Sequence, residues 1–110
     1  MTAIENYHAH VYYDAANRAQ ALALCEAAGQ TFGIKVGRMH DNPVGPHPRG
    51  SCQLTIGIDR LATVLPWLVL NRNGLTIFTH AQTGHAYKDH TDHVIWLGPS
   101  ETLNLAALKS

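Results

Sequence analysis

The chain has 110 residues, 45% of them hydrophobic, and its formal charge is zero when the histidines are neutral. That length supports one hydrophobic core, so we interpret residues 1–110 as a single domain. Its Lys and Arg side chains are scattered, so they do not form the clustered positive charge that binding a nucleic-acid backbone needs. The sequence has no long apolar run and no secretory signal, which predicts a cytoplasmic protein without a membrane partner.

The N-terminal part predicts a strand followed by a helix. Polar and apolar residues alternate over residues 7–13, which is the pattern of a half-buried strand. The polar face of that strand carries His8, His10 and Tyr12. Asp14 then provides an N-cap for an alanine-rich helix over residues 15–28, and Gly29 stands near the expected end of the helix.

The central part predicts two strands separated by a loop, and then a second helix. Residues 35–39 predict a short strand, and the three prolines and two glycines of the following segment, DNPVGPHPRG, exclude regular structure there. Alternation resumes over residues 51–58. Asp59 can cap a helix that continues through residue 70, with Pro66 inside it as a residue that can kink or shorten it.

The C-terminal part predicts a fourth strand over residues 75–79, a fifth over residues 93–97 and a short helix over residues 103–108. The resulting order, βαββαβ with a C-terminal extension, predicts an α+β ferredoxin-like sandwich in which an antiparallel sheet has its helices on one face. Within that sheet we expect the first and third strands to lie parallel in the centre, and the second face to be open.

Histidine is the unusual feature of the composition, because eight histidines are dispersed along the chain. The expected topology brings the start of the first strand, the loop before the third strand and the far ends of the second and fourth strands to one edge of the sheet. Those places carry His8, His10, His40, His47 and His80. Neutral imidazole is a common ligand of iron, copper and zinc, so this convergence predicts a metal site.

Each histidine taken alone has a simpler interpretation. An imidazole on a strand is more often a half-buried hydrogen-bonding group than a metal ligand. The spacing of His85, His90 and His93 resembles a metal motif, but we expect a solvent-facing loop there and no second metal site. Cys25 and Cys52 are expected to be small buried thiols, because a reducing compartment disfavours a disulfide.

Three segments carry a resemblance to a known family: YHAHVYYD, PVGPHP and PWLVLNRNGLTIFTHAQTGHAYKDHTDHVIWLG. Together they resemble the DOPA 4,5-dioxygenase family of small fungal and bacterial proteins over nearly the whole chain. The most specific parts are GPHP at residues 45–48, the pattern His-x-x-Thr-Gly at residues 80–84 and DHTDHVIWLG at residues 89–98. The resemblance implies a ferredoxin-like homodimer that acts as a catechol extradiol dioxygenase. Such an enzyme uses non-haem Fe(II) to insert both atoms of O₂ into L-DOPA or a related catecholic acid.

The same resemblance implies roles for residues by their position. The metal, which is Fe(II) or another divalent ion such as Zn, would be bound by His10, His47 and His80. Acid/base or orienting roles would fall to His8, His40 and His90. The aromatic substrate would contact Arg38, Tyr12, Phe78 and Thr83.

The carboxylates leave alternatives open. Iron oxygenases commonly combine two histidines with one carboxylate, but the glutamates at positions 5, 26 and 101 fall away from the expected cluster. An aspartate such as Asp89 completes the site, or the site is all histidine, or there is no metal. Two further functions also stay open: a metal-independent oxygenase or isomerase that uses a histidine base, and a non-enzymatic dimeric protein that binds a small ligand.

Overall fold

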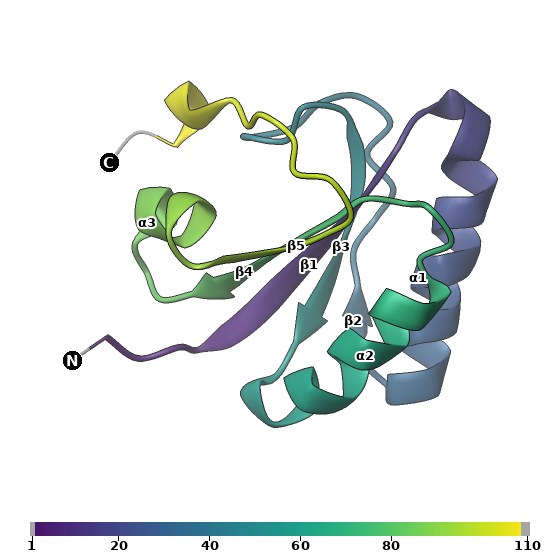
Figure 1. Cartoon of the computed structure of the whole chain (residues 1–110), viewed down its shortest axis with the longest axis horizontal. Helices are drawn as coiled ribbons and strands as arrows, with labels where there is room; N and C mark the ends of the chain where they lie inside the picture. The colour runs from purple at the N-terminus through teal and green to yellow at the C-terminus, as the bar shows by residue number, and fades with distance from the viewer. Residues whose placement is uncertain (1, 109–110) are drawn as a thin grey trace.

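A five-stranded sheet organises the computed structural model, which describes residues 2–108 (Figure 1). The strands are β1 (Asn6–Tyr13), β2 (Lys35–Val36), β3 (Gly50–Ile56), β4 (Ile77–Gln82) and β5 (Val94–Leu97). The helices are α1 (Arg18–Phe32), α2 (Leu61–Asn71) and α3 (Ala86–Thr91). Single 3₁₀ turns occupy Ala15–Asn17, Ile58–Arg60 and Leu105–Ala107. The strand order is β2-β3-β1-β4-β5, which confirms the predicted α+β ferredoxin-like arrangement.

The direction of the central strands corrects one expectation. We expect parallel first and third strands, but β1 and β3 pair antiparallel, as do all neighbouring strands of this sheet. The reason is that the crossover through α1 makes β1 and β2 run in the same direction, and β3 returns between them. The start of β1 therefore lies beside the end of β4, whereas the loop before β3 lies at the opposite end of the sheet.

The core lies between the sheet and the pair α1 and α2, which Figure 1 shows together on one side of the sheet. Side-chain alternation sends the apolar residues of β1, β3 and β4 toward these helices, as the sequence predicts. The buried set from the strands includes Ala9, Val11, Leu54, Ile56 and Ile77. Burying one Val, Leu or Ile side chain contributes about 1.5–3 kcal/mol, so this face anchors the fold.

The first α-helix begins and ends further along the chain than the predicted range 15–28, because it starts at Arg18 after a 3₁₀ turn. It continues to Phe32 and ends at Gly33, whose φ of 65° is left-handed. Gly29 lies inside the helix, where a Cβ atom would sit 2.7 Å from Cγ2 of Val36. This glycine therefore permits a close approach of α1 to β2 and does not end the helix.

Two short elements also differ from expectation. The loop expected between the fourth and fifth strands contains α3, and the C-terminal helix expected over residues 103–108 is a single 3₁₀ turn. An isolated helix of one or two turns is not stable by itself, so periodicity gives little signal for α3. Cys25 and Cys52 are buried free thiols, as expected. None of the helices in residues 2–108 has the length and apolar character needed to cross a bilayer.

Candidate metal centre and active site

Three histidines from two neighbouring strands form the centre of the site. His8 and His10 share one face of β1, and His80 of β4 is the direct register partner of His8. One nitrogen from each of the three rings lies within 4.8 Å of the others. His10 and His80 are 5% and 1% exposed, so the group is largely shielded from solvent. Three imidazole nitrogens at this separation could hold a metal ion.

The hydrogen bonds of His80 determine which of its nitrogens is available. Its Nδ1–H donates to the carbonyl oxygen of Ala81 at 3.0 Å, so its Nε2 atom carries a lone pair. That lone pair accepts a hydrogen bond from Nε2–H of His10 at 3.1 Å. A cation bound between the two rings would replace this single hydrogen bond.

The histidines of the triplet are neutral near pH 7. Burial, with a smaller contribution from the neighbouring His90, lowers the pKa of His80 to about 4. Burial and the adjacent His47 lower the pKa of His10 well below its usual range. Burial also lowers the pKa of His8. A metal ligand must be a neutral imidazole, so these surroundings favour ligation.

His47 reaches the triplet from the loop between β2 and β3. Its ring centroid lies 4.1 Å from that of His10, and burial lowers its pKa to about 4. Its Nδ1 atom lies 2.8 Å from the hydroxyl oxygen of Tyr12, a residue that is fully buried. A buried hydroxyl needs an acceptor. Within residues 2–108, the contact with His47 Nδ1 is the one hydrogen bond of the Tyr12 hydroxyl. We therefore assign Tyr12 as the donor, which leaves the ring proton of His47 on Nε2.

His90 reaches the triplet from α3, on the side of the sheet opposite α1 and α2 (Figure 1). Its ring centroid lies 4.1 Å from that of His80. Its Nδ1–H donates to the carbonyl oxygen of Ala86 at 2.7 Å, so Nε2 is free to accept a proton. His90 thus brings a basic nitrogen to the cluster.

A buried carboxylate anchors α3. Asp89 is 1% exposed and accepts hydrogen bonds from the backbone N–H of Thr83 at 2.7 Å, from its hydroxyl at 2.6 Å and from Nδ1–H of His93 at 2.8 Å. Burial alone would raise the pKa of this carboxyl, but the hydrogen bonds from Thr83 and His93 lower it below its usual value. Asp89 therefore joins the end of β4, the helix and the start of β5.

Comparison with known proteins shows the family of the chain. Residues 7–107 match the model of the Dopa 4,5-dioxygenase family. The chain belongs to the Dopa 4,5-dioxygenase family. The match confirms the resemblance that the sequence motifs indicate.

Relatives of this family member include a fungal enzyme and a cyanobacterial structure. A DOPA 4,5-dioxygenase of Amanita muscaria is 34% identical over 96% of this chain and 50% of its own length. An uncharacterized protein of Botryotinia fuckeliana is 29% identical over 94% of this chain and 63% of its own length. The chain thus spans half of the first protein and less than two thirds of the second. A crystal structure from Nostoc punctiforme, described as a candidate dioxygenase, superimposes with a TM-score of 0.93 at 44% identity, over 96% of this chain and 91% of that one.

A cavity of about 290 Å³ opens beside the histidine cluster of this chain. Its lining includes His10, His40, His47, Arg38, Lys35 and Gln53. His40 and Arg38 therefore lie next to the cluster, and their roles stay predictions. Among the described residues that line this cavity, none is acidic.

Phe78 and Tyr12 are buried side chains on the face of the sheet opposite α1 and α2, which α3 partly covers. Both are 0% exposed. The centroid of the Phe78 ring lies 5.5 Å from that of His80 and 4.5 Å from that of Trp96, so Phe78 packs directly against the histidine cluster. Tyr12 contacts His47 through its hydroxyl.

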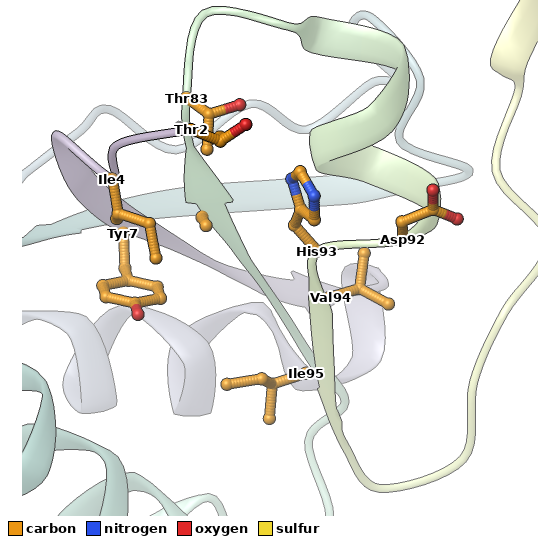
Figure 2. Close-up of a pocket in the computed structure, with 9 residues that line it drawn as sticks. Thr2, Ile4, Tyr7, Thr83, Asp92, His93, Val94 and Ile95 are labelled. Carbon is orange, nitrogen blue, oxygen red and sulfur yellow. The ribbon is translucent and has the colours of Figure 1, made fainter.

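Thr83 lies outside the cluster. Its backbone N–H and its hydroxyl both donate to Asp89, and it lines a second, larger cavity of about 410 Å³ near the starts of β1 and β5 and the end of β4. Figure 2 shows that cavity, with Tyr7, His93 and Ile95 among its walls. None of the triplet histidines lines it, so we place the site at the smaller cavity because the chemistry of the site lies there.

The sequence interpretation misses two features of the site, and only one of them carries a signal in the sequence. The segment DHTDH places Asp89 and His93 four residues apart, which is the spacing that brings side chains together on a helix. The charged pair of Arg49 and Glu101 has no local pattern, because the two residues are far apart in sequence. Within residues 2–108, the candidate metal group contains no carboxylate.

Proposed function

We propose that this chain carries the active site of a catechol extradiol dioxygenase, which binds Fe(II) through His8, His10 and His80 and acts on L-DOPA or a related catecholic acid. The observation that supports this most directly is the group of three neutral imidazoles with nitrogens within 4.8 Å of one another. Bound Fe(II) would supply the open coordination position and the one-electron chemistry that O₂ and a catechol require. In the overall reaction one ring C–C bond breaks and both oxygen atoms enter the product.

The surrounding histidines have complementary proton states for this reaction. Nε2 of His90 has a free lone pair, so it can accept the proton that a catechol hydroxyl loses. Nε2–H of His47 can donate a hydrogen bond to a substrate oxygen. We propose His90 as the base and His47 as the donor.

The lining of the 290 Å³ cavity favours an anionic ligand. It combines the cationic side chains of Arg38 and Lys35 with imidazoles and has no acidic group among the described residues. A guanidinium can bind a carboxylate through two parallel hydrogen bonds, so we propose that Arg38 binds the carboxylate of the substrate. His40 lines the same cavity and is proposed to orient the substrate.

The family resemblance implies His10, His47 and His80 as the metal set, and this stays a prediction that shares two members with the triplet. The two sets differ in whether His8 or His47 is the third ligand. Replacing each by alanine and measuring bound Fe(II) per chain separates them. We expect His8→Ala to lose iron and His47→Ala to keep it while losing turnover.

The proposed activity is tested by anaerobic loading of the full chain with Fe(II), followed by oxygen and one of L-DOPA, caffeic acid or protocatechuate. We expect oxygen uptake that matches substrate loss and a yellow ring-opened product. His80→Ala should abolish both, and the exposed His85→Ala should leave both unchanged. An iron-loaded chain that is silent on all three substrates would indicate a binding protein. Activity with iron in fewer than about a tenth of the chains would indicate a metal-independent enzyme.

We also propose that the protein forms a homodimer. Among residues 2–108, β5 is the last strand of the sheet and one of its edges has no neighbouring strand, and Ile95 on this strand is 37% exposed. Unpaired edges with apolar side chains favour pairing with a second chain. Sedimentation velocity at micromolar concentration tests this proposal. A monomer at every concentration would contradict it.

A further inference from the structure

A line of contacts runs from the C-terminal segment to His47. The guanidinium of Arg49 donates to both carboxylate oxygens of Glu101, at 3.1 and 2.7 Å, and to Asp14 at 3.0 Å. The same guanidinium lies 5.9 Å from the ring centroid of Tyr12. The Tyr12 hydroxyl in turn donates to Nδ1 of His47. Glu101 is thus linked to the candidate active site through two intermediate side chains.

The backbone makes a second link between the same segments. The N–H of Asn104 donates to the carbonyl oxygen of Pro46 at 2.8 Å. Pro46 directly precedes His47, and both are buried. Figure 1 shows the C-terminal segment after β5 lying at the end of the molecule where the loop between β2 and β3 lies. The C-terminal segment therefore holds this loop at Pro46 and at Arg49.

We propose that Tyr12, Arg49 and Glu101 are positioning residues that hold His47 in one rotamer with its proton on Nε2. The catalytic consequence of this proposal rests on the proposed function, but the positioning itself does not. The Tyr12 hydroxyl selects the tautomer, because it donates to Nδ1. The Arg49–Glu101 pair fixes the position of the tyrosine ring and of the loop.

The ion pair is suited to this role by its geometry. Two parallel hydrogen bonds define the orientation of a guanidinium more tightly than one contact does. The Arg49 and Glu101 side chains are 26% and 25% exposed, so solvent screens the pair less than it screens a fully exposed one. Burial, assisted by the charge of Glu101, raises the pKa of Tyr12, so that its hydroxyl stays protonated and remains a donor.

The chain offers matched controls for both contacts. Tyr13 is the next residue of β1, is 2% exposed and donates its hydroxyl to Asp41 on the other face of the strand. Asp41 in turn pairs with Arg18 at 2.7 Å. Tyr12→Phe is therefore compared with Tyr13→Phe, and Glu101→Gln with Asp41→Asn. Each pair removes the same chemical group, but only the first member is linked to His47.

The first measurement does not depend on activity. Nitrogen-15 spectra of the histidine rings and hydrogen exchange of residues 44–50 are recorded on the full chain. In Tyr12→Phe we expect the Nδ1 resonance of His47 to move toward its value in an imidazole without a hydrogen bond. In Glu101→Gln we expect exchange of the loop amides to accelerate about tenfold. Unchanged His47 resonances and loop exchange in both variants would overturn the proposal, even if the enzyme is inactive.

The second measurement applies once ring cleavage is established. Tyr12→Phe and Glu101→Gln should lower kcat about tenfold with KM within about twofold, because a misplaced donor affects the reacting state more than substrate binding. Tyr13→Phe and Asp41→Asn should stay within about twofold of the parent in both constants. An equal loss of kcat in the control variants would show that the effect is one of general stability, which contradicts a specific positioning role.

Discussion

The Nε2 atoms of His10 and His80 lie 3.1 Å apart, although the two residues are 70 positions apart in sequence. Both rings are buried and neutral near pH 7, and the Nδ1–H of His80 is held by a backbone carbonyl. In this structure the two nitrogens share one hydrogen bond, and a divalent cation bound by both imidazoles could take its place.

Metal binding is expected to depend on this pair. His80→Ala should lower the affinity for Zn(II) or Fe(II) by at least about 100-fold, because one ligand is lost and its neighbour loses its orientation. Titration calorimetry with Zn(II) under chelator-buffered conditions measures the change. The control is His85→Ala, which removes an exposed histidine and should leave the affinity unchanged. Equal affinity in both variants would contradict the assigned centre.

Acid should destabilise the metal-free protein at a pH where few carboxylates titrate. Burial lowers the pKa values of His47 and His80 from 6.5 to about 4. As the pH falls below 6.5 the unfolded chain therefore binds more protons than the folded chain, so stability that is present above 6.5 is lost toward pH 4. We expect the free energy of unfolding in urea to be about 2–4 kcal/mol lower at pH 5 than at pH 7.

The matched variant for that experiment is His47→Gln, which removes one of the titrating groups. Its unfolding free energy should depend less on pH between 4 and 6.5 than that of the parent chain, with chelator present in both cases. A slope as steep as the parent's would show that other groups produce the acid sensitivity.

Replacement of Asp89 should loosen α3. The two carboxylate oxygens of Asp89 together accept three hydrogen bonds. Asp89→Asn replaces one of these oxygens by an amide N–H₂ group, which cannot accept and faces groups that already donate. We expect a loss of about 1–3 kcal/mol of stability and faster amide exchange in Ala86–Thr91. Asp92→Asn, at an exposed site three residues later, should change neither quantity. Unaltered exchange in the Asp89 variant would exclude it as the anchor of the helix.

Arg38 should govern the preference for acidic substrates. Arg38→Gln should raise KM for a catechol that carries a carboxylate about tenfold or more, and should leave KM for unsubstituted catechol nearly unchanged. Steady-state oxygen uptake with the two substrates measures the ratio. Arg18→Gln removes a cation that is paired with Asp41 and does not line the cavity, so it should behave as the parent does. An equal effect of the Arg38 variant on both substrates would contradict the carboxylate contact.

Local pattern was sufficient for much of the fold. The alternation in residues 7–13 places His8 and His10 on one face and Ala9 and Val11 on the other, because the side-chain period of a strand is a property of the backbone alone. The order of the five strands, α1 and α2 follows in the same way, whereas α3 does not. Gly29 shows the limit, because a helix-ending glycine and a glycine at a close helix–strand contact look alike in sequence.

The composition of the site was partly predictable, but its geometry was not. Local alternation and turn residues are enough to put histidines at the ends and faces of several strands, and the motifs are enough to indicate the family. The pairing of His8 with His80, the approach of His90 from α3 and the hydrogen bond between Tyr12 and His47 are visible only in the folded chain. Strand direction, register and the docking of a six-residue helix depend on contacts between residues far apart in the chain, and no local pattern of side chains encodes them.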